Sequence, residues 1–259
     1  MKTPRFFRWA SAVAGILAAS AGLRLHATVL DNFDAAARSG WEDANPGNLP
    51  AAFLPEPGGR QGGGQFTFNM PPLGQAYFMS SRKTTDTFEL KEGRTVEYRV
   101  DMVSGRGGDS FAVLAFIPQA TGPNTLAGYG IAKSETDILI TKGINKYFHN
   151  ENPATPIKNN NVTLVLNLRV EGGSVFVTGQ VLDKDDGNKV IFEKTYVDTP
   201  AADVLRTGSD SPAAPFINLP GNFVLYLYGD GGKDPAGYQV VYDNRSEEHT
   251  SELQSRQYL

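Results

Sequence analysis

The chain has no cysteine and only three histidines. Without cysteine it cannot form a disulfide, a cysteine nucleophile, a haem attachment or a thiolate zinc site. His26 and His249 lie near the two ends of the chain, so a Ser-His-Asp triad would have to use His149. We expect His149 to be a loop residue without a chemical role. A zinc site usually takes several nitrogen or sulfur ligands, so the sequence also argues against a histidine-based zinc centre.

The chain also lacks a basic cluster and, beyond its N-terminus, any apolar run long enough to cross a bilayer. The formal net charge is −4 at pH 7, and residues 28–244 are more acidic still because the N-terminal segment is basic. Binding to nucleic acid or to anionic lipid rests on a positive surface. We therefore expect neither nucleic acid nor membrane lipid as a partner.

Residues 1–27 match a secretory signal peptide. Lys2, Arg5 and Arg8 form a basic start. The Ala-rich apolar run over 9–22 that follows falls short of the about 20 residues that a membrane span needs. Cleavage fits best after Ala21 in Ala19-Ser20-Ala21, and Ala27 is a second candidate. The sequence predicts a secreted or cell-surface protein, and the alternative is an uncleaved membrane anchor.

The C-terminal residues 245–259 differ in character from the rest of the chain. The run RSEEHTSELQS, residues 245–255, resembles the translation of a common short-read sequencing adapter. We expect residues 245–259 to be a disordered artefact, and the domain over 28–244 to be truncated at its C-terminus. The alternative is an ordinary polar tail.

Short β-rich runs, separated by Gly, Pro, Asn and Asp, recur over residues 28–244 and predict strands and turns almost throughout. In Val162–Val170 the apolar and polar residues alternate, with Val165 the exception, which indicates a half-buried antiparallel strand. Phe111–Ile117 is apolar on both faces and should lie centrally in a sheet. Expected strands are Thr28–Phe33, Gln65–Asn69, Gln75–Ser80, Thr84–Glu89, Thr95–Met102, Ser110–Ile117, Leu126–Lys133, Asp137–Thr141, Val162–Val170, Ser174–Leu182, Lys189–Val197, Phe223–Tyr228 and Tyr238–Asp243.

Two connections read as hairpin turns. Glu171-Gly172-Gly173 and the segment Asp183–Asn188 carry the Gly and Asx residues that positive φ angles require. So many antiparallel strands in one domain imply two packed sheets. The sequence therefore predicts an all-β fold, a two-sheet antiparallel jelly-roll sandwich.

Three segments carry a resemblance to a known family. They resemble the opening, middle and closing strands of concanavalin A-like lectin/glucanase (LamG-like) domains in secreted bacterial proteins. The segments are Val29-Leu30-Asp31-Asn32-Phe33-Asp34 with Gly40-Trp41, the strand region Phe88–Asp101, and Tyr238–Asn244. The resemblance implies a concanavalin A-like sandwich whose first and last strands pair, with one concave face often used to bind glycans. It does not imply a single function.

The catalytic strands of related enzymes are missing. Laminarinase-like glycosidases carry an E-x-D-x-x-E strand, and Glu135-Thr136-Asp137 lacks the second Glu of that pattern. Jelly-roll alginate lyases carry an R-[ST]-E-L-R strand, whose only counterpart here, Ser251-Glu252-Leu253, lies in the C-terminal segment. We therefore assign no catalytic residue.

Calcium is the ion that the sequence favours, because it takes several oxygen ligands and acidic loops supply them. If the terminal strands pair, Asp31 and Asp34 would lie near Asp243 and Asn244 and could hold structural calcium. The loop Asp230–Asp234 is a second grouping. In each case the alternative is a solvated or capping carboxylate.

Carbohydrate binding would need aromatic platforms and planar polar groups on one face. The residues that alternation places opposite the core in three expected strands supply both kinds of group, and they form one surface if these faces coincide. The candidate carbohydrate-binding residues are Glu97, Arg99, Asp101, Asn167, Arg169, Tyr226 and Tyr228. The alternative is a solvated outer sheet with half-buried tyrosines.

The leading hypothesis is a secreted, non-catalytic β-sandwich that binds a polysaccharide or a cell-surface glycan, with or without structural calcium. A second hypothesis is an anchored structural protein of the cell envelope. A third is a polysaccharide hydrolase or lyase whose acidic catalytic residues are not recognised from the sequence.

Overall fold

The computed structural model describes residues 28–31, 41–44, 66–70, 77–106, 110–118, 128–135, 137–142, 147–151, 157, 160–199, 214–229 and 238–251. Every regular element in these ranges is a β-strand, which confirms the all-β prediction. No helix within them is long and apolar enough to cross a membrane. The expected signal peptide, residues 1–27, lies outside these ranges.

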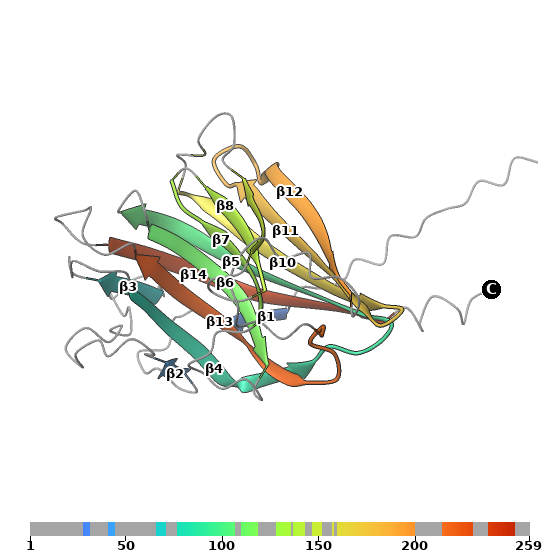
Figure 1. Ribbon diagram of the computed structural model, residues 1–259. Helices are drawn as coiled ribbons and strands as arrows, with labels where there is room; N and C mark the ends of the chain where they lie inside the picture. Colours follow the sequence, from blue (N-terminus) through green and yellow to red (C-terminus); the bar gives the residue numbers. More distant parts are fainter. Residues whose placement is uncertain are drawn as a thin grey trace, which may run out of the picture.

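The strands form two antiparallel seven-stranded sheets. Sheet A contains β1 (Thr28–Asp31), β3 (Phe66–Met70), β5 (Arg94–Arg106), β10 (Val162–Glu171), β11 (Ser174–Asp183), β12 (Lys189–Asp198) and β14 (Tyr238–Ser251). Sheet B contains β2 (Trp41–Ala44), β4 (Tyr77–Glu89), β6 (Ser110–Pro118), β7 (Tyr129–Lys133), β8 (Ile138–Thr141), β9 (Tyr147–Glu151) and β13 (Pro220–Gly229). The two sheets pack face to face (Figure 1).

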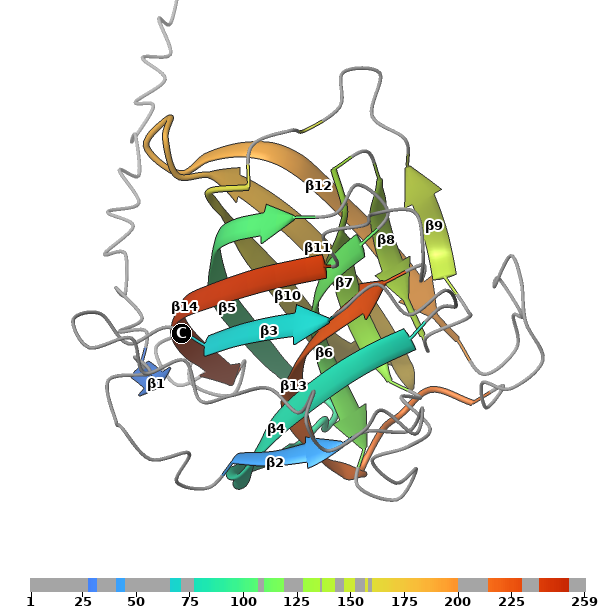
Figure 2. The ribbon, with the colours of Figure 1, turned by 90° about the vertical axis from the view of Figure 1, so that its left-hand side faces the viewer.

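The strand order brings the two ends of the chain together. Sheet A runs β1-β14-β5-β10-β11-β12, with β3 also paired to β14, and sheet B runs β2-β4-β13-β6-β7-β8-β9. The first strand therefore pairs with the last, as the family resemblance implied. β6 lies between β13 and β7 (Figure 2), which confirms the central place predicted for an apolar run.

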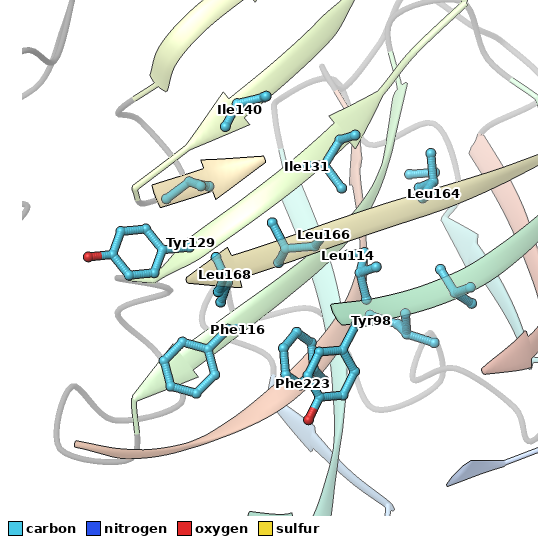
Figure 3. Close-up of a cluster of buried hydrophobic side chains, with 14 of the residues drawn as sticks. Tyr98, Leu114, Phe116, Tyr129, Ile131, Ile140, Leu164, Leu166, Leu168 and Phe223 are labelled. Carbon is cyan, nitrogen blue, oxygen red and sulfur yellow. The ribbon is translucent and has the colours of Figure 1, made fainter. Parts of the chain in front are cut away.

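The hydrophobic core lies between the two sheets. It is built from every second residue of each strand, because successive side chains of a strand point to opposite faces. In β5, Val96, Tyr98 and Val100 are at most 1% exposed, and the intervening residues point away. They meet side chains from sheet B such as Leu114 and Phe116, in one continuous cluster (Figure 3). Full burial of each large apolar side chain contributes about 1.5–3 kcal/mol, so this shared interior holds the sheets together.

Both predicted hairpins are confirmed. Gly172 and Gly173, with φ of 59° and 74°, join β10 to β11. Gly187 and Asn188, with φ of 65° and 64°, end the turn between β11 and β12. Positive φ is open to Gly at no steric cost and to Asn at little. The turns therefore fix the register of three neighbouring strands.

Some strands differ from the prediction. The two strands expected over 75–80 and 84–89 are one long strand, β4, whose pairing with β13 shifts register between Asn222 and Val224. The short edge strands β2 and β9 were not expected. Edge strands are often short and carry polar or charged residues. Such strands give only a weak alternation of apolar residues, so the sequence pattern does not reveal them.

The closing strand runs further than expected. β14 continues to Ser251, and its residues 245–251 pair with β5 and β1. The prediction of disorder is therefore wrong for residues 245–251, while residues 252–259 lie outside the described part. Backbone pairing tolerates most side chains, so a polar segment can extend a strand whose partner is already in place. The resemblance of this segment to an adapter concerns its origin and stays a prediction.

Candidate functional site

The outer side of sheet A carries an ordered set of polar side chains. Because the apolar residues of each strand face the core, the alternate residues must face outward. We call this surface the polar face; it consists of Glu97, Arg99, Asp101, Thr163, Asn167, Arg169, Thr178, Gln180, Glu193 and Thr195. Five of the residues that the sequence analysis selected for carbohydrate binding belong to it.

Glu97, Arg99 and Asn167 form the centre of the polar face. The register pairs Asn167 with Glu97 across β10 and β5. Arg99 donates to Glu97 Oε1 from Nε at 2.8 Å and from Nη2 at 2.6 Å, and Asn167 Nδ2 donates to Glu97 Oε2 at 3.1 Å. The Arg99 side chain is 39% exposed and that of Glu97 is 18% exposed. These three side chains thus form one hydrogen-bonded cluster, and it reaches solvent.

Asp101 anchors a second cluster next to the first. Thr163 Oγ1 donates to Asp101 Oδ1 at 2.6 Å, and Lys184 Nζ forms an ion pair with Asp101 Oδ2. Lys184 lies in the turn after β11, so a hairpin residue reaches over the strands to β5. The sequence analysis did not select Lys184, because nothing local indicates that this turn folds over Asp101.

Arg169 lies at another point of the polar face, near the end of β10. Its guanidinium sits over the Phe176 ring, 4.1 Å from the centroid, and forms an ion pair with Glu171. Arginine stacking on an aromatic face gives a flat, partly exposed platform. Phe176 is therefore an aromatic residue on this surface, and it was not among the residues selected from the sequence.

Tyr226 and Tyr228 do not belong to the polar face. Both lie in β13 of sheet B, opposite Val113 and Phe111 of β6. The prediction that one surface combines them with the residues of β5 and β10 is therefore wrong. Their side chains are outside the part of the chain that the structure describes.

The outer side of sheet B has a different character where it is described. A buried apolar cluster covers β6, β7 and β13 there, made of Val113, Ala115, Ile117, Ala132 and Val224. The hydrogen bonds between the outward-facing polar side chains named above lie on sheet A.

Comparisons with known proteins identify the fold through solved structures. No family model matches the sequence, and no curated protein matches it. The endo-1,3-beta-glucanase from Streptomyces sioyaensis is similar in structure, with a TM-score of 0.51 at 12% identity over 87% of this chain and 96% of that chain. The fold is the concanavalin A-like jelly roll.

Two further solved structures resemble the jelly roll more loosely. A glycoside hydrolase family 16 endo-glucanase from Bacteroides ovatus has a TM-score of 0.48 at 12% identity, over 85% of this chain and 98% of that chain. The lectin-like defence protein arcelin-5 from Phaseolus vulgaris has a TM-score of 0.46 at 8% identity, over 82% and 93% of the two chains. At these identities the likeness does not extend to individual site residues.

Asp31 and Asp243, two of the candidate calcium ligands, lie in the paired terminal strands β1 and β14. Asp31 in β1 pairs with Arg245, and Asp243 in β14 pairs with Asp101. Asp34 is outside the described residues, as are the side chains of Asp31 and Asn244. No group of three or more His, Cys, Asp or Glu within the described part could hold a metal ion. Calcium therefore stays a prediction.

A buried polar network lies inside the jelly roll, and the sequence analysis did not find it. Lys142 Nζ contacts Asp198 at 2.8 Å to Oδ1 and 2.7 Å to Oδ2, and both side chains are at most 2% exposed. Tyr129 donates from its hydroxyl to Asp198 Oδ2 at 2.6 Å and accepts from the Phe216 amide at 3.0 Å. Burial, with the neighbouring Asp198 carboxylate, raises the pKa of Tyr129 well above its usual value. Such a network joins sheet A to sheet B, and its full burial gives it a structural role.

Lys133 is a second buried lysine, at the other end of the β7–β8 hairpin. It is 0% exposed. Its ammonium donates to two neutral oxygens, the Ser134 carbonyl at 3.1 Å and Asn160 Oδ1 at 3.3 Å. Burial lowers the pKa of Lys133 to about 8, partly offset by the charge of Glu135. The only local hint in the sequence is a lysine at the core-facing position after Tyr129 and Ile131.

Proposed function

We propose that the protein is an exported, non-catalytic jelly-roll protein that binds carbohydrate on the polar face of sheet A. The observation that carries the proposal is the cross-strand cluster of Glu97, Arg99 and Asn167. Carboxylate, guanidinium and amide groups are planar and offer several donors and acceptors at once. Because neighbours hold them in place, a glycan would order few side chains on binding.

Replacing Arg99 with alanine should weaken glycan binding about tenfold or more, since hydrogen bonds to charged groups contribute about 1.5–3 kcal/mol. Asn167→Ala should have a similar effect. The measurement is titration calorimetry with the best ligand from a screen of neutral and acidic polysaccharides. Lys91→Ala is the matched control, because Lys91 forms a surface ion pair with Glu89 in the turn outside the polar face.

Wild-type affinity in both variants would exclude the polar face as the binding surface. A failure of the unmodified protein to bind any glycan would favour the alternative of a structural envelope protein.

A polysaccharide hydrolase is the second candidate, favoured by the fold shared with an endo-1,3-beta-glucanase. Asp101 and Asp243 are cross-strand partners, and such partners have Cβ atoms about 4.5–5.5 Å apart. Retaining glycosidases need two carboxyl groups about 5–5.5 Å apart. The test is release of reducing sugar from β-1,3-glucan. If the wild-type protein releases it and neither Asp101→Asn nor Asp243→Asn does, the hydrolase is favoured over the non-catalytic binding protein.

Structural calcium at the paired ends of the chain is a separate proposal that rests on the sequence pattern of Asp31, Asp34, Asp243 and Asn244. A ligand that binds only the folded state raises the free energy of unfolding, by about 2.7 kcal/mol when its concentration is a hundredfold above the Kd. The unfolding temperature must rise with it. We expect the Tm of the full chain to fall on addition of EDTA and to recover with excess Ca²⁺. An unchanged Tm would contradict calcium binding.

A further inference from the structure

We infer that the polar face selects uncharged, hydroxyl-rich glycans and rejects acidic polysaccharides. The inference rests on the proposed function, because it names the ligand class of the same surface. The ion pairs of this face carry it.

Three cations with described side chains lie on the polar face or at its border, and each of them is engaged by a carboxylate of the same chain. Arg99 pairs with Glu97, Lys184 with Asp101 and Arg169 with Glu171. These cations are between 26% and 39% exposed, so they reach solvent without being free. An acidic sugar would have to share a cation with a carboxylate that is already paired to it, and that carboxylate would repel it.

Among the described side chains, Glu193 and Asp243 add further negative charge beside these pairs. Glu193 accepts a hydrogen bond from Gln180 Nε2 at 2.7 Å, a neutral donor. Asp243 lies opposite Asp101 in the register of β14 and β5. Among the described side chains named here, carboxylates therefore outnumber cations, and such an excess of negative charge opposes the approach of polyanions.

The same arrangement suits a neutral glycan. Asn167 and Gln180 each donate from their amide nitrogen to a carboxylate, and the amide oxygen of such a side chain can accept a hydroxyl proton. An ionised carboxylate offers about four lone-pair sites, and Glu193 uses one of them on Gln180. Hydroxyl groups can satisfy these acceptors without breaking an ion pair.

The test measures binding of three ligands at about 20 mM and at about 500 mM NaCl. One is a neutral linear β-glucan oligosaccharide, and the other two are polyanions, polygalacturonate and a sulfated polysaccharide. The Kd for the neutral ligand should change by less than about twofold between the two salt concentrations, because no net charge is neutralised. Neither polyanion should bind at either concentration.

The double variant Glu97→Gln, Asp101→Asn frees Arg99 and Lys184 while keeping the shape of the face. It should gain polyanion binding that weakens about tenfold or more at the higher salt concentration. Glu89→Gln is the control, because it frees Lys91 outside the polar face, and it should gain none.

The outcomes distinguish a failure of the predicted selectivity from a failure of carbohydrate binding itself. Salt-sensitive binding of a polyanion by the unmodified protein overturns the inference and leaves carbohydrate binding intact. Binding of neither ligand class overturns the proposed function, and the inference with it. Neutral binding with no gain in the double variant also overturns the inference, since the ion pairs would then not set the selectivity.

Discussion

Replacing Asp198 with alanine should lower the free energy of unfolding by about 3–5 kcal/mol, the usual cost of breaking a buried ion pair. The variant leaves the Lys142 ammonium, whose side chain is 1% exposed, without its carboxylate. It also removes the acceptor of the Tyr129 hydroxyl at a site that is itself buried. The buried Lys142 charge then loses its carboxylate and the Tyr129 hydroxyl loses its acceptor, and both losses are costly inside the core.

Urea unfolding followed by tryptophan fluorescence and circular dichroism measures this effect. The double variant Asp198→Leu, Lys142→Met should recover much of the loss, because a buried pair and an apolar pair of similar volume have similar stability. Asp186→Ala is the control: its pair with Lys189 is exposed, with 64% and 67% of the side chains accessible, and should cost at most about 1 kcal/mol. Equal losses in Asp198→Ala and Asp186→Ala would contradict the structural role of the network.

Replacing Lys133 with methionine should stabilise the protein by about 1–3 kcal/mol at neutral pH. The ammonium is 0% exposed and has neutral partners in place of a carboxylate, so burial opposes its charged form. The pKa of Lys133 is about 8 in the folded protein, against 10.5 as the ordinary value. That difference corresponds to about 3 kcal/mol that the charged form loses on folding. Methionine fills a similar volume without a charge.

The same shift gives the dependence on pH a definite sign. Between about pH 8 and the ordinary pKa of 10.5, the unfolded chain binds a proton at Lys133 that the folded protein has lost. Stability therefore rises with pH through this window and is lowest, as far as Lys133 is concerned, below about pH 8. Above about pH 10 the raised pKa of Tyr129 acts in the opposite direction, because only the unfolded tyrosine ionises there.

Unfolding free energies measured from about pH 7 to about pH 9.5 isolate the contribution of Lys133. The unmodified protein should gain stability over this range, and Lys133→Met should lose that gain. Lys91→Met, a change at an exposed lysine, should keep the wild-type slope. A slope that is the same in all three proteins would show that Lys133 is not held in a desolvated site.

Local pattern predicted most of the strands and both hairpins. In β10 the alternation of Leu166, Leu168 and Val170 with Asn167 and Arg169 matches the buried and partly exposed positions, whereas Thr163 and Val165 earlier in the strand are buried as well. The turn at Gly172 and Gly173 was predictable because only positive φ angles close so short a connection. Period and turn chemistry act over a few residues, so a single sequence carries them in full.

The candidate site was predictable only in part. Alternation placed Glu97 and Arg99 on one face of β5, but the contact with Asn167 depends on β10 being the neighbouring strand. Tyr226 and Tyr228 were assigned to the same surface because nothing in β13 indicates which sheet it joins. Lys184 reaches Asp101 across 83 positions of the chain, and no local pattern reports such a contact.

By itself, the sequence determined the fold class, the inward and outward residues of each strand, the hairpin turns and the chemistries that lack of cysteine excludes. The tertiary structure decided which strands are neighbours, and with them the ion pairs of the polar face and the pairing of Asp198 with Lys142. The reason is physical. Propensity and alternation are properties of adjacent residues, whereas strand order is set by how two whole sheets bury their apolar faces together.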